Sequence, residues 1–141
     1  MFPSHGSIRF VRIAVASAFL ALPAAVLAAQ YKVALSGAQE VPPVSSPASG
    51  TGTITVNDDG TVSGSLTTTG IASTAAHIHV GSAGKNGPVI VPLAKSGDNG
   101  YSVPASAKLT GEQMKSLKTG DLYVNVHSAA HPGGEIRAQL K

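Results

Sequence analysis

The chain of 141 residues contains no cysteine. This absence excludes disulfide scaffolds, cysteine-based zinc sites, iron–sulfur clusters, thiolate copper centres and cysteine nucleophiles. Tryptophan is also absent, and charged residues make up only 12% of the chain against 43% hydrophobic residues. This composition argues against a disordered chain and against a polybasic nucleic-acid-binding protein, so no nucleic-acid partner is expected. Any metal site must therefore be built from histidine, carboxylate or backbone groups.

The N-terminal segment, residues 1–28, has the pattern of a secretory signal peptide. Two arginines precede an apolar run that ends at Ala28 and that Pro23 interrupts. The run is too short and too broken for a transmembrane helix, which needs about 20 consecutive apolar residues. We expect cleavage after Ala28, with cleavage after Ala29 as the close alternative. The mature protein would then be exported to the periplasm or the medium without a membrane anchor.

The remainder, residues 29–141, is expected to form one all-β domain. Apolar residues alternate with polar ones in successive short runs, and turn residues separate the runs, which is typical of half-buried strands. The pattern predicts seven or eight short strands in an antiparallel Greek-key β-sandwich or flattened barrel. The stretch 42–52 is rich in Ser, Pro and Gly and is predicted to be a loop.

One segment departs from this alternation and predicts a short helix. Thr110 and Gln113 have the spacing of a capping box, in which each side chain hydrogen-bonds to a free backbone donor near the other. Apolar residues follow at helical spacing, and Gly120 stands where a helix would end. The helix is therefore expected over residues 111–118.

Histidines are the residues of the domain that are best suited to chemistry. His77 and His79 lie two apart on a predicted strand, so both imidazoles project from one face with Cα atoms roughly 6.5 Å apart. His127 ends a second predicted strand on its polar side, and His131 follows in a Pro-Gly-Gly turn that can return it to the same face. Three or four imidazoles can thus converge outside the core.

A metal site is the sharper of two interpretations of these histidines. A His-x-His pair alone is weak evidence, because a histidine on a polar face is usually only a solvated residue. His127 on the same predicted face strengthens the case. Imidazole ligands without thiolate suit copper, zinc or nickel, and the affinity order of divalent ions favours copper. We therefore expect Cu(II), with zinc as an alternative, bound by His77, His79, His127 and His131.

Three other charged residues admit less specific interpretations. Glu135 and Arg137 lie two apart on the last predicted strand, and an exposed ion pair that contributes little is the simplest expectation. Alternatively, Glu135 orients a histidine, or Arg137 attracts an anionic ligand. Glu40 has no obvious partner and is expected to help close a loop.

Several ordered motifs resemble one known family. They are Leu35–Val44 (LSGAQEVPPV), Ala76–Gly81 (AHIHVG), Asn86–Val89 (NGPV), Leu109–Gln113 (LTGEQ), Tyr123–His127 (YVNVH) and Gly134–Arg137 (GEIR). Together these resemble the CHRD domain, a module named for chordin and widespread in exported bacterial proteins, over residues 31 to 140. The resemblance implies an extracytoplasmic β-sandwich and does not define a biochemical role.

A weaker similarity concerns mechanism. A His-x-His strand followed much later by Val-x-His is similar to the copper half of Cu,Zn superoxide dismutase. That resemblance implies that His77, His79 and His127 are copper ligands, with His131 a fourth. The chain has no histidine between 80 and 126, no clustered zinc-binding set and no cysteine pair, so a dinuclear site is not expected.

Three hypotheses for function follow. The first is an exported, non-enzymatic copper-binding domain that serves copper handling or tolerance. The second is a mononuclear copper oxidoreductase of the superoxide dismutase type, which needs an open coordination position and redox cycling. The third is a structural or interaction module without metal, in which the histidines only maintain local hydrogen bonds; its protein partner is not identified by the sequence.

Overall fold

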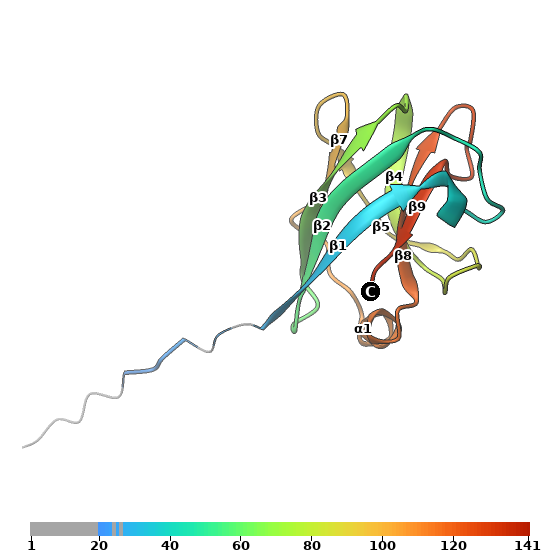
Figure 1. Ribbon diagram of the computed structural model, residues 1–141. Helices are drawn as coiled ribbons and strands as arrows, with labels where there is room; N and C mark the ends of the chain where they lie inside the picture. Colours follow the sequence, from blue (N-terminus) through green and yellow to red (C-terminus); the bar gives the residue numbers. More distant parts are fainter. Residues whose placement is uncertain (1–19, 24, 26) are drawn as a thin grey trace, which may run out of the picture.

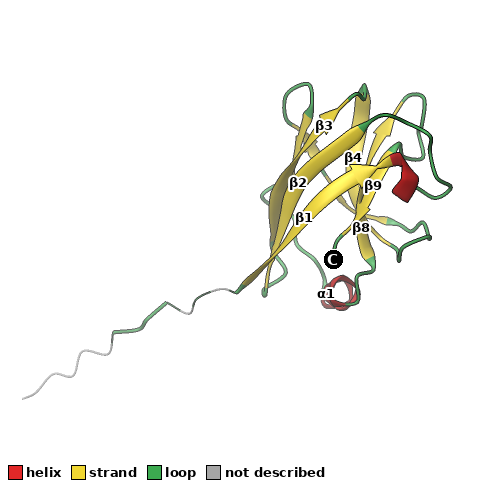
Figure 2. Cartoon of the chain, in the orientation of Figure 1, coloured by secondary structure: helices red, strands yellow, loops and turns green. Residues whose placement is uncertain are grey.

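A computed structural model describes residues 20–23, 25 and 27–141, so the predicted signal peptide falls largely outside the described residues. The described part contains nine strands, one α-helix and one short 3-10 helix (Figures 1 and 2). The strands are β1 (Ala28–Ser36), β2 (Ser49–Asn57), β3 (Val62–Thr69), β4 (Ser73–Val80), β5 (Val89–Pro92), β6 (Ala94–Lys95), β7 (Gly100–Ser102), β8 (Leu122–Ser128) and β9 (Ile136–Gln139). The helix α1 spans Gly111–Lys118, and the 3-10 helix spans Gly37–Gln39.

The strands form a single antiparallel sheet that curls into a nearly closed barrel. Their order is β5-β4-β8-β9-β1-β2-β3-β7-β6, so the last strand, β9, lies between β8 and the first strand, β1. Figure 1 shows the long strands β1 to β3 on one side and β4, β8 and β9 behind them. The prediction of an all-β antiparallel sandwich or flattened barrel with one short helix is confirmed.

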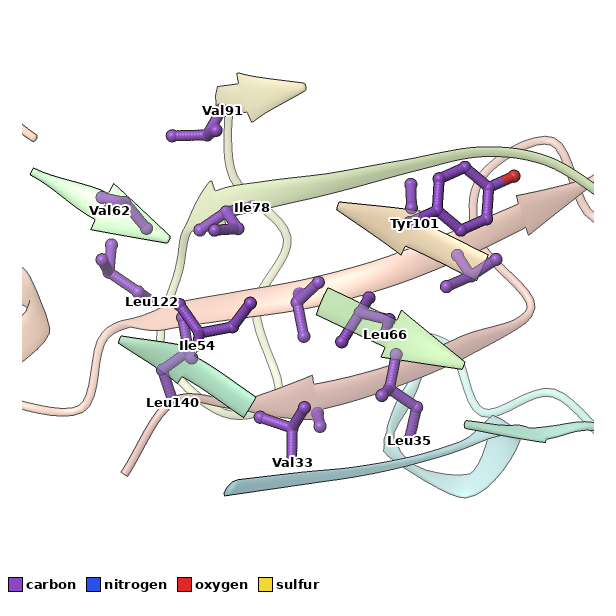
Figure 3. Close-up of a cluster of buried hydrophobic side chains, with 14 of the residues drawn as sticks. Val33, Leu35, Ile54, Val62, Leu66, Ile78, Val91, Tyr101, Leu122 and Leu140 are labelled. Carbon is purple, nitrogen blue, oxygen red and sulfur yellow. The ribbon is translucent and has the colours of Figure 1, made fainter. Parts of the chain in front are cut away.

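The interior of the barrel is filled by the inward-facing residues of nearly every strand. Ile54, Val124, Val126 and Ile136 are completely buried. Figure 3 shows side chains from opposite walls meeting in this core, which a buried tyrosine, Tyr101, extends toward one end. The tight alternation of buried and exposed residues along β3 is what period-two patterning dictates when one face of a strand meets the core.

Two predictions about the strands were wrong in detail. The stretch 42–52 is only partly a loop, because β2 begins at Ser49 and pairs with both β1 and β3. Gly52 makes this possible, since a Cβ there would lie 2.2 Å from the carbonyl oxygen of Ser65 and only glycine allows so close an approach. The number of strands is nine because β6, two exposed residues without alternation, gives no sequence signal.

The predicted helix is confirmed at residues 111–118. The Thr110 hydroxyl accepts a hydrogen bond from the Gln113 backbone amide, and the Gln113 side chain accepts one from the Thr110 amide. Gly120 ends the segment with a φ of +76°. The helix lies at one end of the barrel, beside the start of β8 (Figure 2). It buries Leu117. No helix within the described ranges has the length and apolar character needed to cross a membrane.

Candidate metal centre

Two neighbouring strands carry the three histidines of the candidate site. β4 and β8 pair antiparallel, with His77 opposite Asn125 and His127 opposite Ala75. Ile78, Val124 and Val126 take the core side of these strands. Alternation therefore directs His77, His79 and His127 to the outer side of the sheet, as predicted.

His77 and His127 form a direct contact between imidazole nitrogens. His77 Nδ1 lies 3.0 Å from His127 Nε2. His127 Nδ1 lies 2.9 Å from the carbonyl oxygen of Pro132, which can only accept, so we assign the proton of His127 to Nδ1. The lone pair of His127 Nε2 then accepts a hydrogen bond from His77 Nδ1. A carbonyl that fixes the tautomer and orientation in this way is the usual support of a metal-binding histidine.

The spacing of these two nitrogens matches that of two ligands on one ion. With each nitrogen about 2.0 Å from the metal, a separation of 3.0 Å corresponds to an angle of roughly 95° at the ion. The ion would take the place of the proton that the two rings share. His77 would then carry its proton on Nε2.

His79 differs from the other two because both of its nitrogens already have partners. Nδ1 lies 3.0 Å from the carbonyl oxygen of Gly87, and Nε2 lies 2.8 Å from Asn125 Oδ1. The side chain is buried, with 6% of the residue exposed. Both oxygens only accept, so a neutral His79 donates to one of them, and its other nitrogen must turn away from the second oxygen to coordinate an ion.

The three histidines nevertheless form a group compatible with a metal ion. One nitrogen from each ring can be chosen so that all three lie within 4.8 Å of one another. Three nitrogens bound at about 2.0 Å would be closer together than that, so a small rotation of His79 must accompany binding. The group consists of imidazoles alone, which is the donor set of copper, zinc or nickel.

Burial favours the neutral form, which a metal requires, at two of the rings. It lowers the pKa of His77 from its ordinary value, and the neighbouring rings of His127 and His79 lower it further. Burial also lowers the pKa of His79, against the opposite effect of its hydrogen bonds to Gly87 and Asn125. Protons therefore compete less with a metal ion at these rings than at a solvated histidine.

The fourth predicted ligand, His131, is not part of this group. Its backbone closes the turn after β8, where the His131 amide donates to the Ser128 hydroxyl and the Gly134 amide donates to the His131 carbonyl. The side chain lines a separate surface pocket with Glu40 and Pro132. The turn thus returns the Pro132 carbonyl to the site rather than the His131 ring.

The expectation of an exposed ion pair between Glu135 and Arg137 was wrong. Both residues are buried, and they bind different partners: the Ser46 hydroxyl donates to Glu135 at 2.7 Å, whereas Arg137 lies with its guanidinium carbon 3.5 Å from the ring centroid of Tyr123. The loop 81–88 covers Arg137, which donates hydrogen bonds to the Ser82 carbonyl and to Asn86 Oδ1 in that loop. The loop thus forms a second layer over this face of the sheet, which the alternation of apolar and polar residues alone predicts to be exposed to solvent.

Asn125 is a residue of the site that the sequence analysis missed. It lies on the same face of β8 as His127, is 2% exposed and contacts His79. A Cβ at Gly134 would come within 2.5 Å of both Asn125 Nδ2 and Glu40 Oε1. Glycine at this position therefore provides the space that those two side chains occupy. Period-two spacing from His127 could have identified Asn125 as a neighbour of the histidines.

Comparison with known proteins identifies the family of the domain. A family model described as the CHRD domain matches residues 31–140. The chain belongs to the CHRD family. No curated protein and no solved structure matches it, so the similarity to superoxide dismutase stays a prediction from the histidine spacing. The assignment of a candidate metal site to His77, His79 and His127 therefore rests on the geometry of this domain alone.

Proposed function

We propose that this CHRD domain binds a copper ion through His77, His79 and His127 and serves copper handling outside the cytoplasm. The observation that carries the proposal is the 3.0 Å approach of His77 Nδ1 to His127 Nε2, with a third imidazole in the same group. The signal-peptide pattern of residues 1–28 and the membership of the chain in the CHRD family support export.

Copper is favoured over zinc by the affinity order of divalent ions for nitrogen ligands. The number of ligands does not separate the two ions, because a catalytic zinc ion also takes three protein ligands and a water. Zinc remains the alternative ion of the same site.

Copper affinity of point variants tests the proposal. We expect His77→Ala and His127→Ala each to weaken copper binding about 100-fold, because each removes one of three ligands. His131→Ala is the matched control: it removes a nearby histidine that lies outside the group and should change the dissociation constant less than about threefold. A wild-type protein without micromolar copper affinity, or equal losses in all three variants, would refute the proposal.

A non-metal structural or interaction module is the second candidate, and one observation favours it. His79 is buried, and each of its ring nitrogens lies within 3.0 Å of a protein oxygen, as in a histidine that only holds the fold together. Thermal unfolding separates the two functions. A bound ion raises the melting temperature with metal concentration by mass action, whereas a structural module shows no such dependence.

A further inference from the structure

A buried positive charge lies beside the histidine cluster. The guanidinium carbon of Arg137 is 3.5 Å from the ring centroid of Tyr123, and His79 stacks on the same ring with centroids 4.6 Å apart and planes 5° from parallel. β4 and β9 flank β8 on opposite sides, so Tyr123 stands between the arginine and the candidate ligand. Arg137 is 1% exposed, and water therefore screens its charge poorly.

Among the residues that the structure describes, no carboxylate forms an ion pair with this arginine. Its hydrogen bonds go to neutral acceptors: Gln139 Oε1 at 2.7 Å, the Ser82 carbonyl at 3.0 Å and Asn86 Oδ1 at 3.3 Å. Glu40 is the acid that interacts with it electrostatically, and burial raises the pKa of Glu40 to about 7. Much of that carboxyl is protonated near neutral pH, so the positive charge of Arg137 is only partly compensated.

The donor set adds no negative charge either. The cluster contains three imidazoles and no carboxylate, so a bound copper ion keeps its full charge within the site. A neighbouring cation in a poorly screened environment disfavours the more highly charged of two states. The same environment therefore disfavours Cu(II) relative to Cu(I).

From this arrangement we propose that the site selects copper in the cuprous state, with Arg137 acting through Tyr123 as the residue that sets the preference. The inference rests on the proposed copper function and names the ion that this function handles. Cu(I) is a closed-shell ion like Zn²⁺ and needs no particular ligand geometry, so three nitrogens suffice for it. Cu(II) would have to recruit water as a further ligand beside a buried cation.

Affinities of the full domain for the two ions test the proposal. Dissociation constants for Cu(I), under anaerobic reducing conditions, and for Cu(II) are measured by competition with chromophoric chelators specific for each ion. We expect Cu(I) to bind at least about tenfold more tightly. Tighter binding of Cu(II) overturns this inference and leaves the proposed function standing. Binding of neither ion overturns both.

Charge variants assign the preference to Arg137. One charge at roughly 10 Å in a medium of effective dielectric constant about 20 changes the ratio of the two affinities about tenfold. Arg137→Gln should therefore reduce the preference for Cu(I) about tenfold, and Arg137→Lys, which keeps the charge, should retain it.

Lys85→Gln is the control, because it removes an exposed charge from the loop that covers Arg137. An unchanged ratio in a folded Arg137→Gln protein overturns the assignment; if circular dichroism shows that this variant does not fold, the wild-type ratio alone decides.

Discussion

Replacement of Glu40 by glutamine should stabilise the domain, and more so as the pH rises. Glu40 is 4% exposed, and its Oε1 atom has no hydrogen-bond partner among the described residues. Burial raises the pKa of Glu40 from 4.5 to about 7, although Arg137 and a hydrogen bond from Asn125 act in the opposite direction. The folded protein therefore holds a proton on this carboxyl that the unfolded chain releases.

The sign and size of the effect follow from this difference in proton binding. Between pH 4.5 and 7 the folded state binds more protons than the unfolded state, so the free energy of unfolding falls as the pH rises through that window. Each unit of pKa shift corresponds to about 1.4 kcal/mol, which gives a loss of about 3 kcal/mol above pH 7. Glutamine resembles the protonated carboxyl and cannot ionise, so the variant avoids this loss.

Urea unfolding of wild type and Glu40→Gln at pH 4 and pH 8.5 measures the effect. We expect the two proteins to agree within about 1 kcal/mol at pH 4 and the variant to be more stable by about 3 kcal/mol at pH 8.5. Glu135→Gln is a control of opposite sign. Hydrogen bonds from Ser128 and Ser46 lower the pKa of Glu135, so this variant should be less stable than wild type at pH 8.5, with the difference shrinking below pH 4.5. A stability difference for Glu40→Gln that does not change with pH contradicts the reasoning.

Three further substitutions test the fold around the site. Thr110→Ala removes the N-cap of α1 and should lower the free energy of unfolding by about 1 kcal/mol in urea. Gly87→Ala would place a Cβ 1.6 Å from the Val80 carbonyl oxygen, so a loss of about 2 kcal/mol or more is expected, and a melting temperature equal to that of wild type would contradict the placement of the loop. Tyr123→Phe removes the hydroxyl that accepts a hydrogen bond from the Gly87 amide; it should cost about 1 kcal/mol in urea while copper affinity changes less than about threefold.

Local patterning was sufficient to predict most of the architecture. Alternation identified the strands with an apolar side; the capping box of Thr110 and Gln113 identified the start of the helix, and Gly120 identified its end. The start of β2 was not predicted, because Gly50 and Gly52 are residues typical of loops. Only the structure shows that the close approach of β3 requires glycine at position 52. Pairing with β1 and β3, which holds these residues extended, is a long-range interaction that no local pattern contains.

The candidate site was predicted in part, and tertiary packing explains the rest. Alternation placed His77, His79 and His127 on one face of their strands, and the antiparallel register of β4 with β8 brings them together. The sequence could not show that loop 81–88 covers this face, and so Arg137 was expected to be solvated. The hydrogen bonds of His79 to Gly87 and Asn125 depend on the same loop and on a strand far along the chain.

X-ray absorption spectroscopy of the copper-loaded domain tests the central claim most directly, because it counts imidazole ligands in either oxidation state of copper. We expect three imidazole nitrogens at about 2.0 Å in the wild-type protein and in His131→Ala. One fewer imidazole should remain in His77→Ala, because this substitution removes the ring whose Nδ1 lies 3.0 Å from His127 Nε2. A spectrum without imidazole scattering, or one that His77→Ala leaves unchanged, would contradict the assignment of copper to this cluster.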